Sequence, residues 1–265
     1  MRQTLQYLIE DVGMLRSIAS HEGVIEKLGP DFTVVIKFTS ELASLSPKDF
    51  IERWLISSLN ARFILEGENY TFGKERKGNI NYLHKTNVDY AIETEKFPLL
   101  RANREYGDEV IKSGNIRQAL ELGMIKMATA YLGRNYTLSG RIVQGDKIGR
   151  RIGYPTANID VPPEKIIPPP GVYISRVKIA NSKYSGLLYI GNRPSIPQKE
   201  GRRERRIEIY IPGFKGNLYN REVKAELLEK VREDIRFGNL QQLKAQIKKD
   251  EKELVRRCKS VACQE

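Results

Sequence analysis

The stretch from Gly140 to Asn158 reads Gly-Arg-Ile-Val-Gln-Gly-Asp-Lys-Ile-Gly-Arg-Arg-Ile-Gly-Tyr-Pro-Thr-Ala-Asn, with four glycines among basic residues. Thr156 and Asn158 lie two positions apart, so in an extended segment their side-chain oxygens project from the same face. A hydroxyl and an amide carbonyl beside a flexible basic loop suit a magnesium-bound polyphosphate. The glycines taken alone favour a plainer interpretation, a surface turn in which they adopt positive φ angles.

The sequence pattern changes after Gly133-Arg134-Asn135. Before this point helical and strand-like segments are mixed, and after it short β-type runs are separated by Gly and Pro. These runs cover about 137–143, 172–179, 184–190, 207–211 and 222–228. Five or six short strands without intervening helices predict a small closed antiparallel barrel. A last helix begins at Asn239, and its apolar stripe is expected to pack across the barrel while its basic face meets solvent.

The first half of the chain has the pattern of an α/β layer. Strands are predicted over 32–38 and 62–66, with a helix between them that begins at the cap Ser46 and carries apolar residues at helical spacing. Helices are expected over 1–30 and 113–132, and another strand over Val88–Ile92. We therefore predict two domains, an α/β domain over residues 1–133 and a barrel over 134–265.

Composition narrows the classes of protein that this chain can belong to. Its 265 residues contain no apolar run of membrane-spanning length, and Glu10 and Asp11 interrupt the start before any signal-like segment, so we expect a cytoplasmic protein. Two cysteines and two histidines form no zinc pattern. The formal charge of +12 favours an anionic partner. Without an RNA-reading aromatic motif, we expect no nucleic acid and no membrane partner, and oligomeric state stays undetermined.

The run Ile207–Ile211 contains the acid with the clearest chemical interest. Its isoleucines share one face of a strand, and Glu208 and Tyr210 share the other. Glu208 is either on the wet side of the sheet or inside a functional lumen, where a carboxylate can accept a proton from a substrate hydroxyl. Spacing alone leaves these two alternatives open.

Residues 134–250 resemble the riboflavin kinase module of the bacterial riboflavin kinase/FAD synthetase family. The matching segments are Leu132-Gly133-Arg134, Gly140-Arg141, Gly149–Asn158, Pro170–Tyr173, Ile190–Pro194, Ile207-Glu208, Leu218-Tyr219, Arg232, Phe237 and Leu243–Asp250. They follow one another in order through the C-terminal half, which makes the resemblance specific. It implies a riboflavin kinase-like barrel with a C-terminal helix.

The resemblance also implies where ATP and magnesium bind. Thr156 and Asn158 take the positions of the magnesium and ATP-phosphate site, with Thr156 the surer metal ligand. The loop around Gly145, Lys147 and Gly149 is expected to cover the nucleotide. Phosphoryl transfer needs an aligned nucleophile, neutralised phosphate charge and a proton acceptor, and this set supplies the second requirement.

The remaining roles concern the flavin. Glu208 takes the position of the base that deprotonates the 5′-hydroxyl of riboflavin's ribityl chain, and Arg232 and Phe237 fall in the segment that closes over the flavin. The implied reaction is ATP-dependent phosphorylation of riboflavin to give FMN and ADP.

The N-terminal half resembles the same family's FMN adenylyltransferase module, a Rossmann-like nucleotidyltransferase domain, but incompletely. The loop Gly67–Asn79 fits its pattern, whereas a His-x-Gly-His turn would need two histidines three apart, and His21 and His84 cannot supply it. The family's Ser-Ser-Thr-x-Ile-Arg signature reads Ser113-Gly114-Asn115-Ile116-Arg117 after Lys112. We therefore expect a truncated, degenerate remnant that no longer makes FAD.

Two alternatives to a riboflavin kinase without FAD synthesis stay open. The first is a bifunctional enzyme that makes both FMN and FAD. The second is a non-catalytic flavin- or nucleic-acid-binding regulator, whose binding to DNA or RNA would depend on salt.

Overall fold

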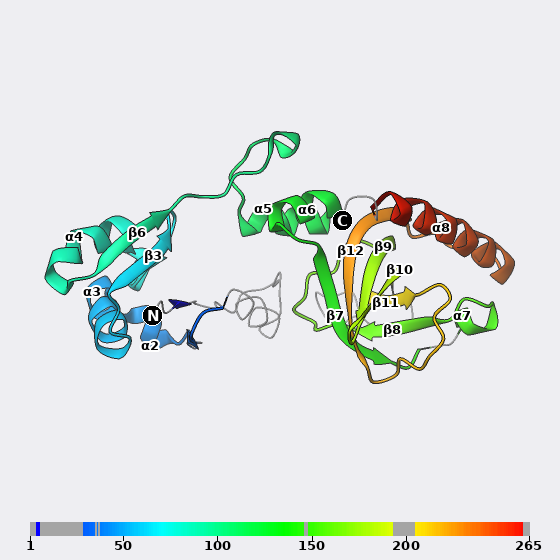
Figure 1. Cartoon of the computed structure of the whole chain (residues 1–265), viewed down its shortest axis with the longest axis horizontal. Helices are drawn as coiled ribbons and strands as arrows, with labels where there is room; N and C mark the ends of the chain where they lie inside the picture. Colours follow the sequence, from blue (N-terminus) through cyan, green and yellow to red (C-terminus); the bar gives the residue numbers. More distant parts are fainter. Residues whose placement is uncertain are drawn as a thin grey trace. The chain divides into compact units, whose positions relative to one another are not determined.

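The structure is a computed structural model that describes residues 4–5, 29–34, 36, 38–145, 148–192 and 205–261. The described residues up to Ile111 form one compact unit, and those from Lys112 onward form a second (Figure 1). Each unit is described below by itself.

The first unit is built from short strands and helices. Two strands pair in parallel in each of two small sheets, and a third pair is antiparallel. Its elements are β1 (Thr4–Leu5), β2 (Thr33–Val34), α2 (Ser40–Ser44), α3 (Pro47–Phe50), η1 (Ile51–Ser58), β3 (Phe63–Gly67), β4 (Thr71–Phe72), η2 (Lys74–Arg76), β5 (Gly78–Asn79), α4 (Ile80–Tyr90), β6 (Glu93–Phe97) and η3 (Arg104–Tyr106). The pairs are β1 with β2, β3 with β6 and β4 with β5.

The helix predicted after Ser46 is confirmed, and it begins as the sequence indicates. The Ser46 hydroxyl accepts a hydrogen bond from the Asp49 amide at 3.0 Å and donates one to the Asp49 carboxylate at 2.6 Å. Pro47 occupies the first turn, where its missing amide costs nothing. After Phe50 the helix widens into the π-helical segment η1.

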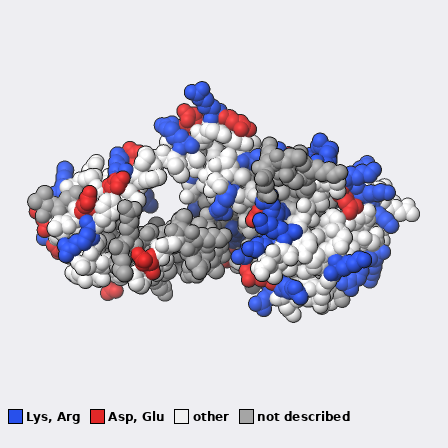
Figure 2. All heavy atoms as spheres, viewed as in Figure 1, with Lys and Arg blue, Asp and Glu red and all other residues white. Residues whose placement is uncertain are grey.

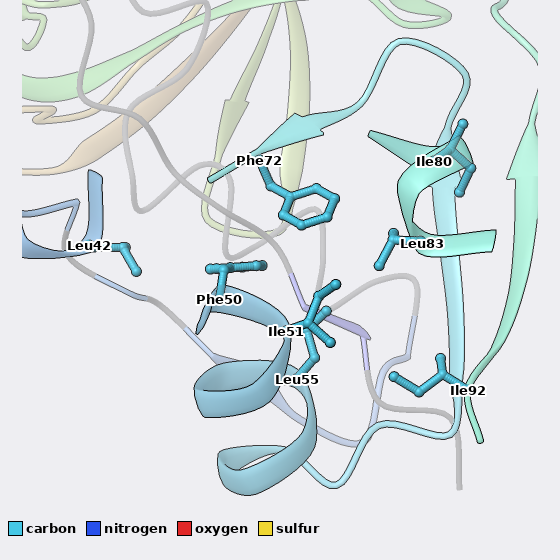
Figure 3. Close-up of a cluster of buried hydrophobic side chains, with 8 residues drawn as sticks. All are labelled: Leu42, Phe50, Ile51, Leu55, Phe72, Ile80, Leu83 and Ile92. Atoms are coloured by element: carbon cyan, nitrogen blue, oxygen red, sulfur yellow. The ribbon is translucent and has the colours of Figure 1, made fainter. Parts of the chain in front are cut away.

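The core of this unit gathers side chains from α2, α3, η1, β4 and α4 (Figure 3). The centroid of the Phe72 ring lies 5.4 Å from that of Phe50 and 6.2 Å from that of Tyr82. The buried members are Leu42, Phe50, Ile51, Leu55, Phe72, Ile80, Leu83 and Ile92. Burying these apolar side chains is the main favourable term that holds the short elements together.

The strand predicted over Val88–Ile92 is wrong. The structure continues α4 to Tyr90, since Ile80 and Leu83 bury one helical face and the Asn79 side chain accepts from the Tyr82 amide at 2.9 Å. The strand follows as β6, a polar run that pairs with β3. Most of the helix predicted over 1–30 lies outside the described residues. Within that range the structure describes residues 4–5, which form β1 and not a helix, and residues 29–30.

The second unit begins with α5 (Ser113–Glu121) and α6 (Ile125–Leu132), which the sequence had placed in the first domain. The boundary in the structure therefore precedes the predicted one at residue 133. Helix α6 packs against strands of the barrel, and Lys126 Nζ lies 2.8 Å from Glu229 Oε1. The boundary between the two units is set by the contacts of these helices with the barrel. A change in amino-acid composition along the chain gives no information about such contacts.

The small closed antiparallel barrel predicted from five or six short strands is confirmed, and it has six strands. Its strands neighbour one another in the order β10-β11-β8-β7-β12-β9, all antiparallel. The elements are β7 (Tyr136–Val143), α7 (Ile148–Arg151), β8 (Thr156–Asp160), β9 (Gly171–Ile179), β10 (Ser182–Asn192), β11 (Arg205–Tyr210), β12 (Glu222–Glu233) and the helix α8 (Leu240–Val261).

Alternation along the strands separates the barrel interior from its outer face. Interior positions are fully buried, including Tyr173 on β9, Leu188 on β10 and Ile209 on β11. On the outer face, Val172 and Leu187 pack against Leu254 of α8. The prediction that α8 packs across the barrel is thereby confirmed, and one outer face becomes a second apolar layer.

The charge distribution agrees with the basic composition. Figure 2 shows more lysine and arginine than acidic atoms on the visible face of the second unit.

Among the described residues, none of the helices is both long enough and apolar enough to span a membrane.

Candidate active site

A cavity of about 260 Å³ lies against the outer face of the barrel, beside α8 and the segment that leads into it. It brings together side chains from β8, β9, β10, β11, β12 and α8. The residues that line it are Gly149, Thr156, Val172, Leu187, Tyr189, Arg206, Glu208, Tyr210, Arg232, Asp234, Ile235, Phe237, Leu243, Ile247 and Asp250. Most of the apolar members come from the barrel face and α8, and half of the polar members lie on the neighbouring strands β8 and β11.

The register of β8 and β11 explains this gathering. Asn158 pairs with Glu208, and Thr156 pairs with Tyr210, across the antiparallel ladder. Directly opposed residues project to the same face, so these four side chains share the outer face of the barrel. Of the two alternatives left open for Glu208, the barrel lumen is excluded: Ile207 and Ile209 fill the interior, and Glu208 faces the cavity.

The Glu208 carboxylate forms an ion pair with Arg206, two residues earlier on the same face of β11. The Arg206 Nε also donates to Asn158 Oδ1 at 3.4 Å. The Glu208 and Arg206 side chains are 13% and 23% exposed, so both are largely withdrawn from water. One guanidinium therefore connects the candidate base to the candidate phosphate site.

Two tyrosine hydroxyls connect the barrel to the elements that cover the cavity. Tyr189 donates to Asp234 at 3.1 Å, and Tyr210 donates to Glu251 on α8 at 3.1 Å. Burial, reinforced by the nearby carboxylates, raises the pKa of each phenol to about 12. Both tyrosines consequently stay neutral hydrogen-bond donors near neutral pH.

Arg232 reaches the cavity from β12 and is fixed by α8. Its Nε lies 3.0 Å from both carboxylate oxygens of Asp250, and its Nη2 donates to Oδ2 at 2.8 Å. Gln246 also donates to Asp250 at 2.8 Å. The Phe237 ring centroid lies 5.9 Å from the Arg232 guanidinium carbon, within reach of a cation–π contact.

Two glycines of the quoted stretch lie directly against the polar strand β8. A Cβ added at Gly145 would collide with the Asn158 side-chain amide, and one added at Gly149 would collide with the Tyr154 carbonyl and lie 3.2 Å from the Thr156 hydroxyl oxygen. Close approach, and not φ freedom, therefore requires glycine at both positions. Lys147 lies outside the described residues.

If the site uses ATP, as the resemblance implies, replacing Gly145 with alanine is expected to displace the Asn158 side chain and lower kcat/KM for ATP roughly tenfold or more, because misplacing a positioning group by about 1 Å can cost 100-fold. Steady-state assays of phosphoryl transfer would measure the loss. A double-mutant cycle provides the control: if Asn158 mediates the effect, Gly145→Ala should add little to Asn158→Ala. Fully additive losses would contradict this mechanism.

The donor atoms of Thr156 and Asn158 provide a test of whether magnesium fits. Mg²⁺ prefers oxygen ligands and is commonly held by one or two protein groups together with substrate phosphates. The described residues contain no cluster of three or more His, Cys, Asp or Glu that could hold a metal by itself. The hydroxyl and amide oxygens of the pair on β8 are oxygen donors of the kind that suits an ion completing its coordination with substrate phosphates.

The structure brings together most of the site residues that the sequence predicted. Gly149, Thr156, Glu208, Arg232 and Phe237 line the cavity. Asn158 accepts from the lining residue Arg206, and Gly145 lies against Asn158. Sequence reasoning missed Arg206, Tyr189, Asp234 and Asp250 as members of the site. Period-two alternation could have placed Arg206 beside Glu208, whereas Tyr189 and Asp234 meet only through tertiary structure.

Comparison with known proteins agrees with both halves of the resemblance. The riboflavin kinase family model matches residues 132–258, and the FAD synthetase family model matches residues 5–113. The two models together account for most of the chain.

The similar proteins include two named bifunctional riboflavin kinase/FMN adenylyltransferase. The protein from Bacillus subtilis is 34% identical over 232 residues, covering 88% of this chain and 71% of the relative. That from Buchnera aphidicola subsp. Acyrthosiphon pisum is 34% identical over 252 residues, covering 94% and 78%. A solved structure titled a macrolide-efflux protein, from Streptococcus pneumoniae, is 29% identical with a TM-score of 0.79 and covers 90% of this chain and 74% of that one.

Proposed function

This chain belongs to the bifunctional riboflavin kinase/FMN adenylyltransferase family, and we propose that its second unit phosphorylates riboflavin at the ribityl 5′-hydroxyl, converting ATP to ADP and giving FMN. The observation that carries this proposal is the convergence of Glu208 and Thr156 on one cavity whose other walls are largely apolar. An apolar pocket with a few convergent polar groups is typical of a small-molecule site.

The apolar part of the cavity suits the flat ring system of a flavin. Val172 and Leu187 line the cavity from the barrel, and Leu243 and Ile247 line it from α8. Phe237 adds an aromatic ring. Arg232, held by Asp250, extends over that ring. We propose that the flavin lies among these residues with its ribityl chain directed toward Glu208.

In the proposed reaction Glu208 accepts the proton of the 5′-hydroxyl while that oxygen forms a bond to the γ-phosphorus. The bond from the γ-phosphorus to the β,γ-bridging oxygen breaks, and ADP leaves with its electron pair. Thr156 and Asn158 would hold a magnesium ion, which neutralises phosphate charge when bound. Gly145, Lys147 and Gly149 belong to the loop that we propose covers the nucleotide.

We propose FMN adenylyltransferase activity as a second function, assigned to the first unit. The expectation of a degenerate unit that has lost FAD synthesis is not supported, because the FAD synthetase model matches residues 5–113 and the relatives are named as bifunctional. A chain can keep a family's fold and activity when individual motif residues differ, since other side chains of similar chemistry can take their places. A cytoplasmic location stays a prediction from sequence.

Product analysis after incubation of the full chain with riboflavin, ATP and magnesium tests both proposals together. We expect FMN and ADP first, followed by FAD and pyrophosphate, separated by chromatography and detected by flavin fluorescence. Absence of FMN would refute the kinase proposal. FMN without FAD, including when FMN itself is supplied, would refute the second. Salt-dependent binding of DNA or RNA without any FMN would instead favour a regulator.

A further inference from the structure

Arg206 occupies a place in the cavity to which neither the sequence nor the family resemblance assigned a role. Its guanidinium is ion-paired with the Glu208 carboxylate and donates to the Asn158 carbonyl oxygen at 3.4 Å. These two partners are the groups to which we assign proton acceptance and phosphate binding. Arg206 therefore lies between the two halves of the proposed reaction.

The charges that line the cavity make this position consequential. Its described acids are Glu208, Asp234 and Asp250, and its described bases are Arg206 and Arg232. Arg232 already has acceptors of its own, namely both oxygens of Asp250 and the Glu233 carbonyl at 2.9 Å. Arg206 pairs with Glu208 and donates to Asn158, two groups that the proposed reaction uses.

A triphosphate at Thr156 and Asn158 would bring several negative charges close to the Glu208 carboxylate. Like charges in a site withdrawn from water repel strongly, so ATP binding there needs a compensating cation besides any metal. An arginine fork matches phosphate oxygens in geometry and forms charge-assisted hydrogen bonds with them. Arg206 is already within reach of Asn158, so a small movement would bring it to a phosphate there.

We propose that Arg206 binds the terminal phosphate of ATP, and that its guanidinium exchanges the Glu208 carboxylate for this phosphate when the nucleotide binds. The proposal rests on the riboflavin kinase function proposed above. The Arg206 guanidinium leaves the Glu208 carboxylate only when a phosphate is present to bind it. The Glu208 oxygens are therefore available to the ribityl hydroxyl only when the nucleotide is bound. Nucleotide binding and the readiness of the base are thereby coupled through one side chain.

The substitution Arg206→Gln tests the contact through binding, without any turnover. Dissociation constants of the full chain for ADP and for a non-hydrolysable ATP analogue would be measured by calorimetry with magnesium present. We expect Arg206→Gln to weaken the analogue about tenfold or more, the range of a hydrogen bond to a charged group, and to change ADP affinity less than about threefold. Arg206→Lys keeps the positive charge but not the forked geometry of the guanidinium. Its affinity for the ATP analogue should fall between those of the wild type and Arg206→Gln.

The matched control is Arg176→Gln, which removes a barrel arginine paired with Glu226 at 3.7 Å and absent from the cavity lining. It should leave both affinities unchanged. Nucleotide bound by the first unit is common to all variants, so differences between them report the second unit.

Equal weakening of ADP and the ATP analogue, or no weakening in either Arg206 variant, would overturn the proposal. Wild-type chain that makes FMN while Arg206 variants keep full analogue affinity would refute the inference alone. Wild-type chain that makes no FMN, but loses analogue affinity in Arg206→Gln, would refute the kinase and leave the phosphate contact standing.

Discussion

Replacing Glu208 with glutamine is expected to lower kcat for FMN formation roughly 10²- to 10⁴-fold, the usual contribution of a general base. Glutamine keeps the size of the side chain but cannot accept the proton of the ribityl hydroxyl. The carboxylate lies on the cavity wall at 13% exposure, where bulk water is poorly placed to act as a substitute base. Stopped assays of FMN under saturating riboflavin and ATP would measure the loss.

Nucleotide affinity distinguishes a lost base from a damaged site. Glu208→Gln also removes the charge that holds Arg206, so affinity for a non-hydrolysable ATP analogue should stay the same or rise. Glu226→Gln, at a barrel glutamate outside the cavity lining, should leave kcat unchanged. A fully active Glu208→Gln enzyme would remove this residue from the proton-accepting role.

Replacing Asp250 with alanine is expected to destabilise the second unit by about 3–5 kcal/mol, the cost of leaving one member of a buried ion pair without its partner. The Asp250 side chain is 4% exposed, and it accepts hydrogen bonds from Arg232 on β12 and from Gln246 on α8. Truncation would leave the Arg232 guanidinium, 15% exposed, without its main acceptor. Hydrogen exchange of peptides from β12 and α8 would report the loss locally.

The control for this prediction is a second arginine–carboxylate pair in the same barrel. Glu226 lies 3.7 Å from Arg176, and both side chains are about a third exposed. Exposed pairs contribute at most about 1 kcal/mol, so Glu226→Ala should change exchange much less. Equal effects of the two substitutions would show that the buried Asp250 pair contributes no more to stability than the exposed Glu226 pair. Riboflavin affinity should fall only in Asp250→Ala, because Arg232 lines the cavity and Arg176 does not.

Much of the second unit could be predicted from local pattern. Alternation along 172–179 placed Tyr173 and Val177 on one face, and both are buried in the barrel interior. The same period of two placed Thr156 with Asn158, and Glu208 with Tyr210, on shared faces. These predictions succeed because a strand's side-chain direction depends only on position along the chain.

Two predictions about the first half went beyond what local pattern can decide. Val88–Ile92 looks β-like, yet α4 extends to Tyr90 because its earlier residues Ile80 and Leu83 already bury a helical face. The domain boundary at 133 followed a change in composition, whereas the helices before it pack with the barrel. In both cases contacts with residues distant in sequence outweighed local preference.

The closed barrel, the helix that crosses it and the polar residues along β8 and β11 could all be predicted from the pattern of residues along the chain. Periodicity fixes which side chains share a face, and the resemblance gave those side chains their expected roles. The folded structure was needed to show that this face is the outer one, covered by α8, and that Arg206 contacts both Glu208 and Asn158. The period of a strand sets the direction in which each side chain points. Which element covers a face of the barrel, and which charged side chains form ion pairs, depends on packing between distant parts of the chain.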